Sequence, residues 1–178
     1  MRKTLPALAV ASLSFLGAIG TAQAQVNLKN YVQCRSTELV QFPGTLVEAA
    51  IATPELSTLT NLVVAANLVG PLSGPGPFTV FAPTNAAFAK VPAPLLSLIG
   101  SDTGLLTSVL TYHVSAGTAD PRRSLIPTQV KTLQGQTLYA CYDADGASVN
   151  QSVAACKGVQ TRNGTVWLID SVLLPQFK

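Results

Sequence analysis

The chain contains 178 residues, of which 48% are hydrophobic and 11% are charged, and its formal net charge at pH 7 is +3. This length predicts one domain with one sizeable hydrophobic core. The small charge gives no electrostatic basis for binding nucleic acid. The basic pair Arg122-Arg123 is too short for a polyanion site, so we interpret it as part of a solvated loop.

Residues 1–24 are predicted to be a secretory signal peptide. A basic start is followed by an apolar run over residues 5–19 and by a small-residue A-x-A pattern that ends at Ala24, which predicts cleavage before Gln25. The apolar run is shorter than the ~20 residues that a bilayer span needs, and no later segment is long and apolar enough either. We therefore expect a periplasmic or secreted protein with no transmembrane span in the mature chain.

Residues 25–41 are predicted to be a polar lead-in, and residues 42–176 a single domain that begins with helices. The first helix is expected over residues 45–52, with Thr45 as its N-cap and Glu48 three residues later, the pattern of a capping box. A second helix is expected after Thr53-Pro54, with Thr53 as cap and proline at the first helical position. The Pro- and Gly-rich residues 71–77 then end this helical half.

A strand that turns directly into a helix is predicted next. Phe78 to Phe81 is β-branched and aromatic, as buried strands are, and Pro83 ends the strand because it lacks an N–H donor. Thr84 or Asn85 can cap the following short helix, whose apolar face carries Phe88. Two further helices are expected over residues 92–99 and 102–111.

After residue 113 the pattern changes to short strands. Residues 136–142 and 147–150 flank Asp145-Gly146, and residues 158–162 and 165–173 flank Asn163-Gly164, both of which are two-residue hairpin signals. Helices, one strand, more helices and then a run of strands predict an α+β fold. We expect an antiparallel sheet assembly with helices packed around one side.

Three segments in this order resemble the hallmark motifs of the fasciclin domain, a family of extracellular adhesion modules. They are residues 78–88, the dipeptide Tyr112-His113 and residues 163–175, and the resemblance covers roughly residues 42–175. It implies a wedge-shaped β-sandwich in which the strands near residues 80 and 170 meet. The residues that we assign to the structural motifs are Phe78, Phe81, Pro83, Thr84, Asn85, Phe88, Asn163, Gly164 and Asp170.

The resemblance also implies a function. It predicts a non-enzymatic extracellular or periplasmic binding module, engaged in cell-surface or matrix adhesion through contacts with a protein or a polysaccharide. Some relatives of this fold bind carotenoids, so a soluble carrier of a small hydrophobic ligand is the alternative. In a chain this rich in apolar residues, however, such residues also simply fill a core.

Three aromatic or imidazole side chains are the candidates for adhesive contacts: Tyr112, His113 and Trp167. In fasciclin domains the Tyr-His pair is linked both to adhesion and to packing, and Trp167 stands where the family commonly has His. Each can instead lie in the core, and for His113 we favour a buried, hydrogen-bonded role. Asp170 is interpreted as a structural residue that needs a partner on an otherwise apolar strand face.

Nothing in the sequence assembles an active site. There is a single histidine, the eight acids are scattered, and the G-x-S-x-G and H-E-x-x-H patterns are missing, so we predict neither an enzyme nor a cofactor. The absence of C-x-x-C argues against a metal site. Asp143 to Gly146 resembles the start of a calcium loop but lacks the closing Glu, and a turn is the better interpretation.

Three cysteines, Cys34, Cys141 and Cys156, predict one disulfide and one free thiol in an oxidising compartment, or else an intermolecular bridge. We favour Cys141 with Cys156, because that loop is the shortest and closes most easily. Cys34 is the alternative partner.

Overall fold

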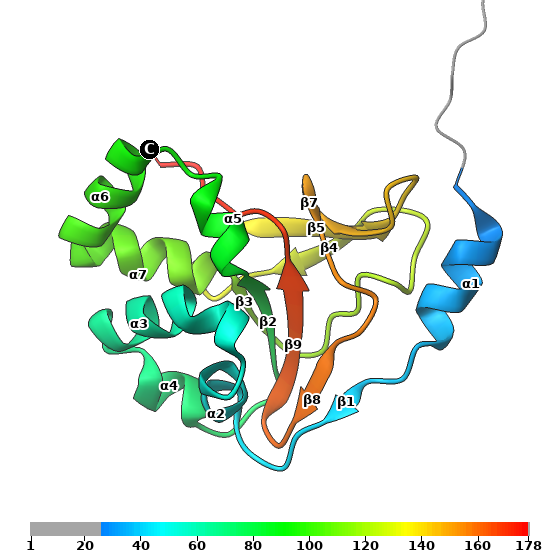
Figure 1. Ribbon diagram of the computed structural model, residues 1–178, viewed down its shortest axis with the longest axis horizontal. Helices are drawn as coiled ribbons and strands as arrows, with labels where there is room; N and C mark the ends of the chain where they lie inside the picture. The colour runs from blue at the N-terminus through cyan, green and yellow to red at the C-terminus, as the bar shows by residue number, and fades with distance from the viewer. Residues whose placement is uncertain (1–25, 178) are drawn as a thin grey trace, which may run out of the picture.

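The computed structural model describes residues 26–177, so the predicted signal peptide lies outside the described residues. Helices dominate the first two thirds of this range (Figure 1). They are α1 (Leu28–Ser36), α2 (Leu46–Ile51), the 3-10 turn η1 (Pro54–Leu56), α3 (Ser57–Ala65), α4 (Val69–Ser73), α5 (Asn85–Ala89), α6 (Ala93–Ser101) and α7 (Thr103–Tyr112).

The strands form two sheets. They are β1 (Val40–Gln41), β2 (Phe78–Pro83), β3 (Val114–Ala116), β4 (Thr128–Lys131), β5 (Thr137–Tyr142), β6 (Ala147–Val149), β7 (Ser152–Val153), β8 (Val159–Thr161) and β9 (Gly164–Ile169). One sheet has the order β1-β8-β9-β2-β3, and the other has the order β4-β5-β6-β7.

The two predicted motif strands lie side by side. β2 and β9 pair in parallel over their whole length, from Phe78 opposite Gly164 to Pro83 opposite Ile169. This confirms that the segments near residues 80 and 170 meet. The expectation of a purely antiparallel assembly was wrong for this sheet, because β1 also runs parallel to β8. The intervening helices supply the long crossover that parallel neighbours require.

Side chains alternate between two cores along β2 and β9. Ala82 and Val166 face the helices and pack with Leu59 and Leu106. Phe81 and Trp167 face the second sheet, where Leu138 and Val149 are fully buried. Helices α2 to α7 thus cover one face of the first sheet, and the second sheet covers the other (Figure 1). The α+β sandwich with helices on one side is therefore confirmed.

The helix starts show how far local signals are obeyed. Thr45 and Glu48 form the predicted capping box on α2. Thr53 precedes Pro54 as expected but caps nothing, since its hydroxyl donates instead to the carbonyl of Ala49. Pro71 does not end the helical half, because it lies in the first turn of α4, where its missing N–H costs no hydrogen bond.

The first hairpin has a longer loop than the predicted two residues, and the second has a two-residue loop that is shifted by one position. Residues 143–146 connect β5 to β6, so Cys141 lies opposite Ser148. In the second hairpin Thr161 pairs with Gly164, which places the turn at residues 162–163 and makes Gly164 the first residue of β9. A Cβ on Gly164 would overlap the carbonyl oxygen of Phe78, so close strand contact requires glycine there.

The segment that was predicted as a polar lead-in contains the helix α1. Asn27 caps this helix by accepting from the backbone N–H groups of Lys29 and Asn30. Cys34 is the one buried residue of this helix, so the alternation of apolar and polar faces that reveals most helices is weak here. Tyr31 packs edge-on against Tyr142 with a ring-centre separation of 5.0 Å.

The disulfide joins Cys34 to Cys156, with a Cα–Cα distance of 5.0 Å, and Cys141 keeps a half-buried thiol. The favoured pairing of Cys141 with Cys156 was wrong. Loop length ranked the pairs, but β6 and β7 form between those two cysteines and lead the chain across to the first sheet, where Ala154 bridges Ile169. Cys156 therefore meets α1 instead of β5.

Within residues 26–177 no single helix is long and apolar enough to cross a membrane. The consecutive helices α6 and α7 reach the required length only together, and the chain bends by 107° between them. Ile99, Leu106 and Leu110 of this pair are buried in the helical core.

Candidate functional site

The three predicted contact residues are all buried: Tyr112 is 5% exposed, His113 2% and Trp167 1%. Their interpretation as surface contacts is therefore corrected, and the core alternative holds for all three. Tyr112 is the last residue of α7 and packs in the core with the second sheet, and His113 is the C-cap of that helix. Trp167 faces the second sheet from the middle of β9.

His113 holds the C-terminal segment to α7. Its Nδ1 lies 2.8 Å from the carbonyl oxygen of Val109, and its Nε2 accepts from the N–H of Leu173 at 2.9 Å. A carbonyl can only accept, so Nδ1 carries the proton and the imidazole is neutral. Burial lowers the pKa of His113 to about 4, against a smaller opposing effect of the Val109 hydrogen bond.

Trp167 is part of a buried polar cluster that ties α1 to the sheets. Its Nε1 donates to Ala119 O at 3.0 Å, and the Arg122 guanidinium lies 4.6 Å from its ring centre. Arg122 also donates to the carbonyl oxygens of Thr37 and Cys156 at 2.7 and 3.0 Å. The expectation of a solvated loop was wrong for Arg122, which is 6% exposed, although the Arg123 side chain is 78% exposed.

Asp120 completes that cluster. Both of its carboxylate oxygens accept from Arg122 at 2.9 Å, the bidentate geometry that suits a guanidinium. Burial alone would raise the pKa of Asp120, but the hydrogen bonds and charge of Arg122 outweigh it and hold that pKa below its usual value. Asp120 is therefore still charged near pH 6.5, the ordinary pKa of a histidine side chain.

The motif residues are structural connectors. Thr84 caps α5 through its hydroxyl, and Asn85 accepts from the N–H of Thr58 and donates to the carbonyl of Pro54. Asn163 is buried and joins three elements, because it accepts from the N–H of Leu46 and donates to the carbonyl of Leu72. Each amide thus fixes a helix end against a neighbouring element.

Asp170 directly follows the last residue of β9, and it is paired as the sequence analysis expected. It accepts from Lys90 Nζ and from the N–H of Val153, both at 2.8 Å. The ion pair is exposed, at 56% for Lys90 and 47% for Asp170. Burial acts to raise the pKa of Asp170, but the bonds from Lys90, Val153 and Ser171 lower it overall.

A groove of about 690 Å³ runs beside the buried Tyr112. One wall is the face of α7 that carries Leu105, Ser108 and Tyr112, which recur at helical spacing. Asp102 starts this helix by accepting from the N–H groups of Gly104 and Leu105. The opposite face of α7 packs in the helical core, so the face with Leu105 and Ser108 is the one that is left to line the groove.

The other walls are the β4–β5 turn and the C-terminal segment. The turn supplies Gln134, Gln136 and Thr137, and Gly135 takes the left-handed backbone conformation that closes it, at a φ of +105°. The Gln136 side chain bonds both main-chain groups of Gln176, donating to its carbonyl at 2.8 Å and accepting from its N–H at 2.9 Å. These two hydrogen bonds hold the C-terminal segment in place as a wall of the groove.

The groove offers uncharged hydrogen-bonding groups and one aromatic ring. Among residues 26–177, the side chains of Thr137 and Gln176 have no hydrogen-bond partner, so their polar atoms are free to bind. Phe177 is 51% exposed beside them. Every residue that lines the groove is uncharged, which suits a neutral ligand rich in hydroxyl groups.

Comparison with known proteins identifies the family. The model of the family described as "Fasciclin domain" matches residues 54–175. The chain belongs to the fasciclin domain family.

Two curated relatives of this fasciclin domain come from Mycobacterium bovis. The chain is 47% identical over 132 residues to the cell surface glycolipoprotein MPB83 of Mycobacterium bovis, covering 71% of this chain and 59% of that protein. It is 44% identical over 132 residues to the immunogenic protein MPB70 of the same species, covering 71% of this chain and 67% of MPB70. The chain therefore spans less than two thirds of the length of MPB83.

A solved structure shares the fold. It is a FAS1 domain pair from the insect cell adhesion molecule Fasciclin I, which superimposes with a TM-score of 0.61 at 15% identity. The match covers 75% of this chain and 52% of that chain. At this identity the likeness concerns the fold alone.

The groove residues of this fasciclin domain lie outside the motifs that the sequence analysis used. They come from a helix face, a turn and a tail that are spread over residues 105–177. Of these lining residues only Tyr112 was among the predicted site residues, and it is 5% exposed. The helical spacing of Leu105, Ser108 and Tyr112 was the one available signal, and nothing linked it to Gln176.

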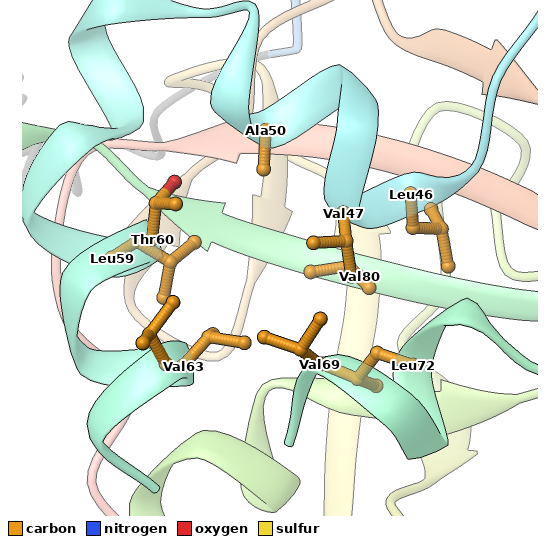
Figure 2. Close-up of a pocket in the computed structure, with 10 residues that line it drawn as sticks. Leu46, Val47, Ala50, Leu59, Thr60, Val63, Val69, Leu72 and Val80 are labelled. Carbon is orange, nitrogen blue, oxygen red and sulfur yellow. The ribbon is translucent and has the colours of Figure 1, made fainter. Parts of the chain in front are cut away.

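A second, apolar pocket lies between the helices and the first sheet. Figure 2 shows side chains from α2, α3, α4 and β2 converging on it, among them Val47, Val63, Val69 and Val80. Its volume is about 40 Å³, far below the ~300–1,000 Å³ of typical small-molecule pockets. In this conformation it is a packing space of the core and does not hold a large ligand.

Proposed function

We propose that this fasciclin domain is an extracellular, non-enzymatic adhesion module that binds a neutral polysaccharide in the groove beside α7. The observation that supports this most is the lining, which combines free amide and hydroxyl groups with the exposed ring of Phe177 and carries no charge. Sugar hydroxyls both donate and accept hydrogen bonds, as amides do, and the C–H face of a sugar ring packs on an aromatic ring.

The extracellular location is supported by three observations. The sequence begins with a predicted signal peptide, the domain holds a disulfide, and a close relative is called a cell surface glycolipoprotein. The similarity to a cell adhesion molecule in fold agrees with an adhesive role.

The absence of catalysis is supported by the state of His113. This is the single histidine of the chain, and both of its ring nitrogens are engaged in the core, which leaves no free imidazole for general base catalysis. Within residues 26–177 no three side chains of the metal-binding types come together.

Titration calorimetry with neutral oligosaccharides, such as glucan and mannan fragments, tests the proposal. Phe177→Ala is expected to weaken binding about fivefold, because a lost stacking contact costs about 1 kcal/mol. Gln176→Ala removes a groove amide but keeps the tail in place, since Gln136 bonds only the main chain of Gln176. We expect this variant to lose a similar amount of affinity.

Ile126→Ala is the matched control, because this side chain is 75% exposed and lies outside the groove. It should bind the same oligosaccharides as the unchanged protein does. Equal affinities for Phe177→Ala and Ile126→Ala, or binding of none of the neutral sugars, would contradict the proposed site.

The alternative function, a carrier of a hydrophobic ligand, is supported by the apolar pocket of Figure 2 alone. A carotenoid would have to separate α2, α3 and α4 to enter it, because its present volume is about 40 Å³. Protein purified from the native host distinguishes the two: a visible absorption band would favour the carrier.

A further inference from the structure

A second groove lies where the two sheets meet. β3 and β4 are edge strands of their sheets, and they touch through one antiparallel bridge between Ser115 and Thr132. Beyond this bridge they part around a space of about 330 Å³, with Ala140 among its lining residues. The groove therefore lies between the edges of two strands.

The main chain of β4 points into this groove at Gln129. Hydrogen bonds alternate along an antiparallel strand, and Thr132 uses its N–H to reach Gln136 on the β5 side. The N–H of Leu133 donates to the carbonyl of Val114 in β3, and the carbonyl of Lys131 accepts from the Ser115 hydroxyl. The main-chain N–H and C=O groups of the odd-numbered residues therefore face away from β5. Tyr139, opposite Gln129, bonds Asn150 instead, which leaves the Gln129 N–H and C=O facing the groove.

The main-chain groups of Val114 and Ala116 in β3 face β4. The N–H of Gly117 donates to the carbonyl of Pro77, and the N–H of Phe81 donates to the carbonyl of His113. The main-chain groups of odd-numbered residues around β3 therefore form hydrogen bonds with β2. Val114 faces β4, where its carbonyl accepts from Leu133, and Ala116 is the next residue in that alternation. The bridge between Ser115 and Thr132 pairs Ala116 with Lys131, so the strand edge that stays open to this groove is that of β4 at Gln129.

The charge of the groove is positive. Three charged residues line it: Asp120, Arg123 and Lys131. Both oxygens of Asp120 are already bonded by the buried Arg122. Arg123 is 3.7 Å from Asp120 and largely exposed, and Lys131 is exposed on the same side, so the two cations are available to a ligand.

We propose that this groove binds an extended acidic segment of a partner protein, which adds as a strand to the edge of β4 at Gln129 and pairs its carboxylates with Arg123 and Lys131. Main-chain bonds from such an added strand give affinity, and side chains at alternate positions give specificity. This surface is separate from the neutral groove beside α7, so the proposal does not depend on the polysaccharide site.

Charge and lining select this occupant over two others. A second copy of the chain would bring the cations Lys131 and Arg123 of both copies together along the shared edge, which is unfavourable. An acidic polysaccharide would match the charge, but it would not use strand-edge donors, and the residues that line this groove include no aromatic ring for a sugar to pack on.

Fluorescence anisotropy with a labelled peptide of alternating Glu and Val tests the proposal. Gln129→Pro removes the N–H that faces the groove but no bond to β5, and Gln129→Ala keeps that N–H and removes only the side chain. We expect Gln129→Pro to weaken binding tenfold or more and Gln129→Ala to weaken it less than twofold. Lys131→Gln should weaken binding and reduce its dependence on salt.

A measurement on the unchanged protein guards against misfolding of the proline variant. Methylation of alternate backbone nitrogens of the peptide removes its strand donors and should abolish binding, and a Lys-Val peptide should not bind. Equal affinities for the Pro and Ala variants, or full binding of the methylated peptide, would overturn the proposal. So would binding of alginate that survives Gln129→Pro, or a dimer in ultracentrifugation that this variant dissociates.

Discussion

The two ends of the described chain are held by buried polar groups of opposite kinds. The N-terminal anchor is the Cys34–Cys156 disulfide with Arg122, whose guanidinium bonds Asp120 and main-chain carbonyls of both arms. The C-terminal anchor is neutral His113, which accepts from the N–H of Leu173. The first is covalent and permanently charged, whereas the second depends on an imidazole that must remain unprotonated.

This difference predicts two independent ways of loosening the molecule. Reduction should free α1 and leave the C-terminal segment in place, because His113 makes no contact with the disulfide cluster. Acid should do the reverse, since protonated His113 has no lone pair at Nε2 to accept from Leu173. Hydrogen exchange at the amides of α1 and at Leu173 reports the two events separately.

The largest effect is expected from removal of the disulfide. Cys34 and Cys156 are 122 residues apart, and a loop of this length stabilises a fold by about 5 kcal/mol in the chain-entropy account. The double variant Cys34→Ser with Cys156→Ser should lose stability on this scale in denaturant unfolding. Cys141→Ser is the control and should behave like the unchanged protein; an equal loss there would reassign the bridge.

Replacement of Arg122 is expected to cost nearly as much. Arg122→Ala leaves the half-buried Asp120 carboxylate and two main-chain carbonyls without their donor, and breaking such a pair costs about 3–5 kcal/mol. Arg123→Ala should change the free energy of unfolding by less than about 0.5 kcal/mol, because that side chain is exposed. Similar losses in both variants would remove Arg122 from the anchor.

Acid should destabilise the protein through His113. The folded pKa of about 4 lies below the ordinary 6.5, so between these values the unfolded chain binds a proton that the folded chain does not. Stability should therefore fall by about 3 kcal/mol as the pH drops from 6.5 to 4. The His113→Gln variant should lack this slope over the same range, and a parallel slope in both proteins would assign it to other groups.

The smallest effect is expected at the exposed pair next to the C-terminal anchor. Asp170→Ala should cost about 1 kcal/mol, because the exposed bond to Lys90 contributes little and the bond from the N–H of Val153 supplies most of the loss. Lys90→Ala should cost less still in thermal unfolding. If Lys90→Ala costs more than Asp170→Ala, the order of the two contributions is reversed.

Much of the fold was predictable because local signals and burial agree. The capping box at Thr45, the β-branched strand after Phe78 and the helical spacing along α7 each act within a few residues, and all three elements formed. The motif order then placed β2 beside β9, which local signals alone cannot do.

The remainder depended on long-range contacts. α1 is polar along most of its surface and is fixed by a disulfide, so its sequence carried little periodic signal. The burial of Arg122 follows from carbonyls supplied by residues 37 and 156, which no local pattern brings together. The groove beside α7 was missed for the same reason, because its tail wall is placed by His113 and Gln136 from far along the chain.

The position of the C-terminal segment affects how the protein should be handled. Gln176 and Phe177 line the neutral groove, whereas α1 lies on the other side of the molecule (Figure 1). An affinity tag fused behind Lys178 would start beside the groove and compete with a sugar for it. Sugar-binding assays therefore call for a tag at the amino end of the mature chain, or for one that a protease removes completely.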